Sequence, residues 1–293
     1  MEFKINIVER FTEWLTHEGK ASATIASYIN DVKQFNQYLA VKDVDPEVLL
    51  TRFLFTNYMK QLETEGMAVS TINKKVNSLK VYNDWLYHEK MVEDVFISIK
   101  KDKVKIATGS EAEVSVLTDT QVEQFLFHLE KESQRNKLIG YLLLYTGLRV
   151  SELVNIQLTD VDQLTAQLTV RGKGGKLREV PLRKDVLEAL QQYQKGERAS
   201  SKHSQSLYLL VSQRAERMHR DAARRWLEQT GVKLGFHMHP HMIRHTFATR
   251  LLHRGNVSIT TVSKLCGHAS LNMTMRFYIN TSKEEKQSAV DKL

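Results

Sequence analysis

The feature that most constrains this chain is a helical spacing of apolar residues that proline rarely interrupts. Only three prolines occur in 293 residues, at Pro46, Pro181 and Pro240. Through most segments apolar residues recur three, four and seven positions apart, which is the spacing of one helix face. Because proline breaks helices, its scarcity leaves these faces continuous. The sequence therefore predicts a mostly α fold.

The first third of the chain predicts a compact helical domain over residues 1–99. Four amphipathic segments fit within it. Ser22 and Ser70 are expected to cap the second and fourth helices, and Gly19 and Gly66 to end the first and third. The residues expected to face inward are Ile7, Phe11, Trp14, Leu15, Tyr28, Val32, Phe35, Leu39, Ile72, Val76, Leu79 and Leu86.

The pattern changes over residues 100–114, where charges are frequent and periodicity is weak. Such a stretch is typical of an interdomain linker. An exposed loop within a single domain is the alternative.

Residues 115–293 predict a second domain that adds a small antiparallel β-sheet to its helices. Thr118 and Gln121 form a capping-box pattern, and apolar residues follow at helical spacing. A strongly apolar helix is expected to stop at Gly147. Strands are expected at 166–170 and 177–182, on either side of a glycine-rich turn.

The charge of the chain is unevenly distributed, with a formal net charge of +8. Residues 1–110 hold 15 basic and 15 acidic side chains, so residues 111–293 supply the whole excess, 27 against 19. This favours a nucleic-acid partner, with a solvated basic surface as the alternative.

The single cysteine, Cys266, excludes an internal disulfide. No apolar run reaches the roughly 18 residues of a membrane span, and no signal peptide is apparent. We therefore expect a cytoplasmic protein.

The glycine-rich turn over residues 171–176 does not match a nucleotide-binding loop. Its glycines are followed by Lys176 and Leu177, whereas the phosphate-binding loop requires Lys and then Ser or Thr. Lys173 at the tip could enter a DNA minor groove or reach a phosphate. An exposed basic turn is the other interpretation.

One further segment, over residues 237–250, carries candidate chemistry. Pro240 suits a first helical turn, after which His241, Arg244 and His245 project from neighbouring positions. They could hold a phosphate. Alternatively, a metal could be bound by the histidines of this segment, which are His237, His239, His241 and His245.

Together and in order, these segments resemble the tyrosine recombinase (phage integrase) family. The match is carried by Arg149 in TGLRVSEL, Lys173 in GKGGKLREVPL, His241 and Arg244 in HMIRHTFAT, His268 in CGHASL, and Tyr278. Residues 22–39 and 70–86 resemble the family's SAM-like core-binding domain. The resemblance covers nearly the whole chain. Cys266 stands where a larger aliphatic residue is common, and the interval from His268 to Tyr278 is at the longer of the usual spacings.

The resemblance implies that Tyr278 attacks a DNA phosphodiester, which leaves a 3′-phosphotyrosyl bond and a free 5′-hydroxyl. Guanidinium groups suit the charge that develops on the phosphate oxygens. The implied roles are phosphate binding by Arg149 and Arg244, a proton acceptor from Tyr278 or a further donor to the phosphate at His241, a hydrogen-bond donor at His268, a general acid at Lys173 and an orienting carboxylate at Glu152. No metal and no cofactor are needed.

The implied partner is a double-stranded DNA recombination site, bound by a dimer and exchanged within a tetramer. Expected DNA contacts are Arg171, Lys176, Lys74 and Lys75. A tail from about residue 279 would dock on a neighbouring protomer. The organisation is similar to the simple two-domain Xer-like or Cre-like type, bacterial or encoded by a mobile element and associated with the nucleoid.

Within the family, we favour a transposon-encoded cointegrate resolvase. A chromosome-dimer-resolving Xer enzyme and a phage-type integrase are the alternatives. Three other classes are a type IB topoisomerase, a DNA-binding protein without catalysis and a histidine-based metal nuclease.

Overall fold

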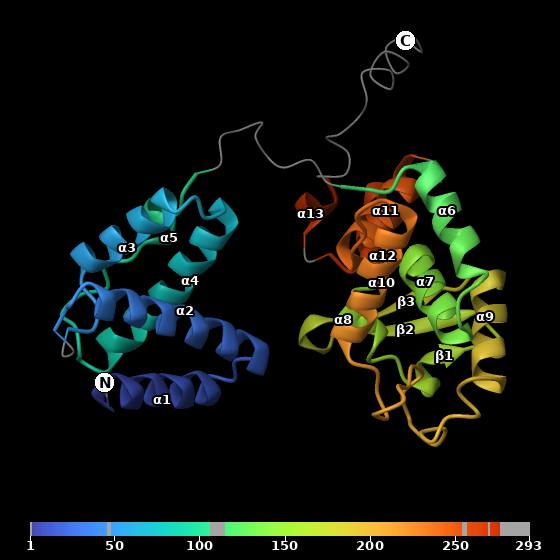
Figure 1. Cartoon of the computed structure of the whole chain (residues 1–293), viewed down its shortest axis with the longest axis horizontal. Helices are drawn as coiled ribbons and strands as arrows, with labels where there is room; N and C mark the ends of the chain where they lie inside the picture. Colours follow the sequence, from blue (N-terminus) through green and yellow to red (C-terminus); the bar gives the residue numbers. More distant parts are fainter. Residues whose placement is uncertain (1, 46–47, 106–114, 254–256, 269, 276–293) are drawn as a thin grey trace, which may run out of the picture. The chain divides into compact units, whose positions relative to one another are not determined.

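The chain folds as two units, Met1–Glu111 and Ala112–Leu293 (Figure 1). The computed structural model describes residues 2–45, 48–105, 115–253, 257–268 and 270–275. In this part of the chain, no helix is both long enough and apolar enough to cross a membrane.

The first unit is a helical bundle around an aromatic core, as predicted. Phe11 lies 5.1 Å from both Tyr82 and Trp85, measured between ring centroids. All the residues expected to face inward are buried except Trp14 and Tyr28, which are partly buried. The helices are α1 (Glu2–His17), α2 (Ser22–Val41), α3 (Arg52–Thr64), α4 (Val69–His88) and the short α5 (Ile99–Asp102).

Two predicted helix caps are wrong. Helices α2 and α4 are preceded by Ala21 and Ala68, whose extended backbones occupy the cap positions without a side-chain hydrogen bond. Ser22 and Ser70 therefore lie inside the first turns. Each helix begins earlier than the serine suggests, because the last non-helical residue is the alanine and not the serine.

The start of the predicted linker is also revised, since it packs on the first unit. Helix α5 covers residues 99–102, and its Asp102 forms an ion pair with Arg52 at 2.6 Å. The Asn73 side chain exchanges two hydrogen bonds with the backbone of Val104, at 3.0 and 2.9 Å. The remaining linker residues, 106–114, lie outside the described residues.

The second unit places a three-stranded antiparallel sheet among helices, which confirms the predicted fold class. The described strands are ordered β1-β2-β3, with Leu168 of β2 opposite Val180 of β3. The strand β1 was not predicted, because two residues carry no alternation. The strands are β1 (Val161–Asp162), β2 (Gln167–Arg171) and β3 (Leu177–Pro181).

Helix α7 (Gln134–Thr146) packs between α6 (Asp119–Leu129) and α9 (Lys184–Lys195) (Figure 1). The predicted capping box at Thr118 and Gln121 opens α6. The apolar α7 is largely buried and ends at Gly147, whose left-handed φ of 60° turns the chain sharply. A side chain there would overlap Phe247. The C-terminal helices are α10 (Arg220–Leu234), α11 (Pro240–His253), α12 (Ile259–Cys266) and α13 (Leu271–Met275).

Candidate active site

The turn after α7 delivers an arginine and a carboxylate to the same point. Arg149 is the cap residue of the short helix α8 (Val150–Leu153). Its backbone N–H donates to Glu152 Oε2 at 2.9 Å, and its Nη1 donates to Glu152 Oε1 at 2.9 Å. The Glu152 side chain is only 5% exposed. Because the two residues are three positions apart across one turn, this pair was within reach of the sequence pattern.

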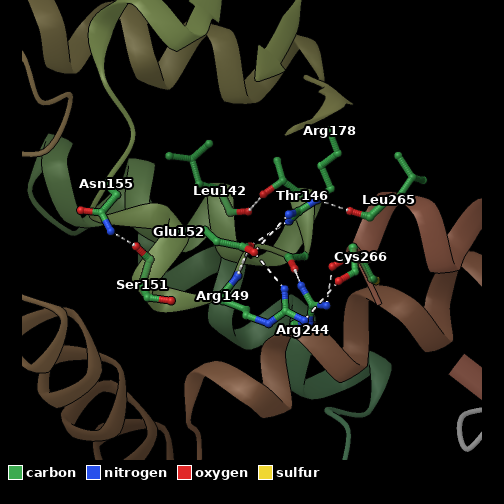
Figure 2. A network of polar contacts seen from close by, with 12 residues as sticks. Leu142, Thr146, Arg149, Ser151, Glu152, Asn155, Arg178, Arg244, Leu265 and Cys266 are labelled. Atoms are coloured by element: carbon green, nitrogen blue, oxygen red, sulfur yellow. Dashed lines mark hydrogen bonds and ion pairs between the residues drawn. The ribbon is translucent and has the colours of Figure 1, made fainter. Parts of the chain in front are cut away.

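A third residue, Arg178, also binds the Glu152 carboxylate, and sequence reasoning missed it. Arg178 extends from β3 and donates to both Glu152 oxygens, from Nη1 at 3.1 Å and Nη2 at 2.8 Å (Figure 2). Burial raises the pKa of Glu152, but the hydrogen bonds from Arg178 and Arg149 outweigh it and hold the pKa below its usual value. Glu152 is therefore an anion clamped between two guanidinium groups.

The C-terminus of α12 gathers three arginines through three consecutive carbonyl groups. The carbonyl of Leu265 accepts from Arg178 Nε at 2.9 Å, that of Cys266 from Arg244 Nη2 at 2.5 Å, and that of Gly267 from Arg149 Nη2 at 3.2 Å. The last carbonyls of a helix have no partner within the helix, and they carry its negative partial charge. The helix end thus fixes guanidinium groups that come from three distant segments.

Arg244 is the most deeply placed of the three. It is 4% exposed, and its hydrogen bonds among the described residues go to the carbonyls of Gly147 and Cys266. Burial lowers its pKa to about 10, so the group remains charged at neutral pH. Among the described residues no carboxylate is hydrogen-bonded to Arg244, and such a buried cation is suited to bind an anion.

Three histidines lie around this cluster, and the pKa of each is lowered, although His241 is exposed. Burial is the main cause in each case, and the charge of Arg244 adds to it. The pKa of His241 is lowered, and the pKa values of His245 and His268 fall to about 4. A neutral imidazole donates a hydrogen bond from one ring nitrogen and accepts one at the other.

His268 lies directly after the turn at Gly267, as predicted. Its Nδ1 is 2.7 Å from the hydroxyl of Thr274 in α13, a second residue that sequence reasoning missed. Thr274 is fully buried. A threonine looks like an ordinary packing residue until its partner is known, so no pattern signalled this contact.

The alternative prediction for this segment is a metal site formed by His237, His239, His241 and His245. His237 and His239 lie 5.3 Å apart, and His241 and His245 lie 6.3 Å apart, both measured between ring centroids. Within the described ranges, no group of three or more histidine, cysteine or acidic side chains is arranged to hold a metal ion. His239 instead accepts a hydrogen bond from the backbone of Met242 in the first turn of α11.

Comparison with known proteins covers both units. The model of the phage integrase family matches residues 115–285, and the phage integrase N-terminal SAM-like domain matches residues 8–90. The chain belongs to the phage integrase family. The predicted resemblance is confirmed.

The relatives of this phage integrase family member include a resolvase and recombinases. The TnP I resolvase of Bacillus thuringiensis is 28% identical over 99% of this chain and 100% of that protein. Tyrosine recombinase XerC of Staphylococcus haemolyticus is 31% identical over 91% of this chain and 90% of that protein. The fold of the Tn1549 transposon integrase, solved with transposon right end DNA, matches with a TM-score of 0.72 at 19% identity, over 98% and 99% of the two chains. This chain is a site-specific tyrosine recombinase, an enzyme that cleaves and rejoins DNA.

The predicted basic hairpin of this recombinase forms as expected. The Gly172 N–H donates to the Lys176 carbonyl at 2.7 Å, and Lys173 lies in the 3₁₀ turn at the tip. Lys176 is exposed. Arg171 is also exposed, and it forms an ion pair with the buried Asp160 at 3.1 Å.

The predicted DNA contacts in the first unit are revised. Lys74 is about half exposed and donates to both oxygens of Asp31 at 2.8 Å. Lys75 is 3% exposed and is bonded to Gln34 and Tyr58. A lysine enclosed in this way cannot reach a duplex. Within the first unit, a DNA contact therefore remains proposed for Lys74 only. Tyr278 and the tail from about residue 279 lie outside the described residues.

Proposed function

We propose that this recombinase binds one scissile phosphate of duplex DNA over the C-terminus of α12 and transfers it to Tyr278. The observation that carries the proposal is the buried charge of Arg244, whose hydrogen bonds among the described residues go to carbonyl oxygens. Those bonds use two of the five guanidinium N–H groups. A phosphate diester supplies the missing negative charge.

Arg149 is the second phosphate ligand in this proposal. Its bonds to Glu152 and Gly267 hold the guanidinium beside that of Arg244. As the tyrosine oxygen attacks, negative charge grows on the nonbridging oxygens. Two fixed guanidinium groups stabilise that charge more than they stabilise the ground state.

The histidines and the hairpin lysine complete the proton transfers. The tyrosine oxygen forms a bond to phosphorus as the bond to the 5′-oxygen breaks. Neutral His241 takes the phenol proton, and Lys173 gives a proton to the leaving 5′-oxygen. His268 donates from Nε2 to a phosphate oxygen, which requires that Nδ1 accept the Thr274 hydroxyl. Rejoining reverses these steps with the 5′-hydroxyl of another strand.

The biological role that we propose is resolution or integration of a mobile element, with a dimer at each core site and a tetramer in the synapse. The end-to-end match with the TnP I resolvase supports this role. The match with XerC favours chromosome-dimer resolution as the second candidate. Deleting the gene distinguishes them: unresolved element cointegrates support the first, and unresolved chromosome dimers support the second.

The chemistry is tested with DNA that flanks the gene, nicked close to the candidate site so that the cleaved end diffuses away. The protein is incubated with it in excess chelator and quenched with SDS. We expect a protein–DNA adduct with the wild type and none with Tyr278→Phe. An adduct in both, or loss of the adduct on chelation, would refute the mechanism. A supercoiled plasmid with two sites separates recombination from the simple relaxation of a topoisomerase.

A further inference from the structure

Three arginines donate to the carbonyls at the C-terminus of α12, and Arg178 is the one to which the family resemblance assigned no role. It lies in β3, opposite Val170 of β2, and its side chain is 12% exposed. Three of its nitrogens donate to the site: Nε to Leu265, and Nη1 and Nη2 to Glu152. Figure 2 shows it on the side of Glu152 away from Arg244. All three donor nitrogens are thus committed within the protein.

This commitment separates Arg178 from the phosphate ligands. Its two terminal nitrogens form a bidentate pair with a carboxylate, the strongest and most directional partner that a guanidinium has. Arg244, in contrast, is hydrogen-bonded to carbonyl groups. The charge of Arg178 is therefore balanced by Glu152 before any DNA arrives.

Through Glu152, Arg178 is connected to Arg149. The oxygen Oε1 accepts from both guanidinium groups, at 2.9 Å from Arg149 and 3.1 Å from Arg178. Because Glu152 is buried and held at both oxygens, its position sets the orientation of the Arg149 guanidinium group. Without Arg178, the carboxylate could swing and pair more closely with Arg149, which would draw that guanidinium away from a phosphate.

Arg178 also packs against the turn that carries His268. A Cβ atom on Gly267 would lie 2.9 Å from Arg178 Nη1 and 3.2 Å from its Cδ. Gly267 has a left-handed φ of 62°, which also favours glycine. The strand that leads from the Lys173 hairpin is thereby joined to the Glu152 carboxylate and to the α12 turn by one side chain.

We propose that Arg178 is a positioning residue, which fixes Glu152 so that Arg149 points at the scissile phosphate and which anchors the α12 turn to β3. This inference rests on the proposed function, because it concerns the same phosphate site. It predicts a defect in the cleavage step with little change in DNA affinity.

The test compares Arg178→Met with Arg183→Met, an exposed arginine two residues beyond β3 that has no part in the site. Single-turnover adduct formation is measured at saturating protein on the nicked DNA, and affinity by mobility shift. We expect R178M to slow adduct formation about 30- to 100-fold, as when an outer partner of a site ligand is removed. Its dissociation constant should stay within about threefold of the wild-type value. R183M should change neither. A wild-type rate in R178M, or a loss confined to affinity, would overturn the proposal.

The double variant E152Q/R178M shows whether Arg178 acts through Glu152. If it does, the double variant is no slower than the slower single variant by more than about threefold. If the rate losses of the two single variants multiply in the double variant, Arg178 acts independently of Glu152, and the proposal is overturned. Should R178M fail to fold, Arg178→Lys keeps the charge and one hydrogen bond. We then expect about a tenfold loss of rate, and an unchanged rate would count against the proposal.

A readout without DNA separates this inference from the proposed function. In ¹⁵N spectra of the arginine Nε–H groups of the full chain, R178M and E152Q should each move the Arg149 signal, whereas R183M should not. An unmoved Arg149 signal overturns the positioning role. If the signal moves but the wild-type protein forms no adduct, the proposed function fails and the positioning role stands.

Discussion

Each unit of this recombinase contains a cluster in which a buried carboxylate lies among basic side chains, but the excess positive charge of the two clusters is handled differently. In the first unit, Asp31 is 2% exposed and accepts from Lys74 at 2.8 Å and Ser78 at 2.6 Å, with Lys75 at 3.7 Å. In the second unit, Glu152 is held by Arg149 and Arg178. Each cluster holds more positive than negative groups.

The difference lies in whether the excess charge can be lost. Burial lowers the pKa of Lys75, so losing its charge costs less than it would for an exposed lysine. Burial also lowers the pKa of Arg244, but only to about 10, and a guanidinium does not deprotonate near neutral pH. The lysine cluster can therefore be structural, whereas the arginine cluster retains a charge that a bound anion must balance.

The variant with the largest expected effect on this comparison is Arg244→Lys. An ammonium group can lose its charge and lacks the planar, two-nitrogen donor edge of a guanidinium. We expect adduct formation to slow by on the order of 10²–10³, the effect of losing an oriented donor to a transition-state oxyanion. Single-turnover cleavage measures it, with Arg183→Lys as the exposed control. A loss below about threefold would show that the guanidinium donor edge at this position is dispensable.

The next test breaks the lysine cluster. Asp31→Ala should lower the free energy of unfolding by about 3 kcal/mol, because it leaves Lys75 buried without its carboxylate. Lys75→Met should cost less than about 1 kcal/mol, since methionine fills the same space and Asp31 keeps Lys74. Urea unfolding in a Trp226→Phe background reports the first unit, through Trp14 and Trp85. Equal losses would mean that the cost of removing Asp31 does not arise from Lys75.

A smaller effect concerns the histidines of the second unit. The pKa values of His245 and His268 are about 4 in the folded protein and near 6.5 when unfolded. The unfolded chain therefore binds these protons first, so the free energy of unfolding should fall as the pH drops from 6.5 toward 4. His245→Gln should make this slope shallower by about one proton, measured by urea unfolding at Trp226 between pH 7 and 5. An unchanged slope would mean that His245 takes up no proton on unfolding.

The smallest expected effect is at Thr274. Thr274→Val keeps the shape but removes the hydroxyl that faces His268 Nδ1. We expect adduct formation to slow about five- to tenfold, the worth of one hydrogen bond. Thr274→Ser restores the hydroxyl and serves as the control. If both variants match the wild-type rate, the Thr274 contact has no part in orienting the ring.

Local signals predicted much of this molecule. The capping box at Thr118, the stop at Gly147 and the two main strands depend on neighbouring residues, and the sequence placed them to within about one residue. Serines misled at α2 and α4, because an alanine before them already had the extended backbone of a cap. Lys74 and Lys75 looked alike in sequence, and only packing distinguishes them.

The missed parts of the active site are those set by long-range contacts. Arg149 and Glu152 are three residues apart, so their pairing follows from helix geometry. Arg178 meets Glu152 across 26 residues and Leu265 across 87. In sequence it was one more basic residue beside a basic hairpin. Its position in β3 points it at the site, and that register is known only once the sheet is folded.

The three carbonyls at the end of α12 also affect which side chains the arginine contacts require at positions 265–267. They are main-chain atoms, which nearly every residue supplies, so the side chains at positions 265 and 266 are released from holding the arginines. This explains how Cys266 can replace a bulkier residue without disturbing Arg244. The hydrogen bonds to the arginines thus place no demand on those two side chains, whereas at Gly267 both the left-handed backbone and the contact with Arg178 favour glycine.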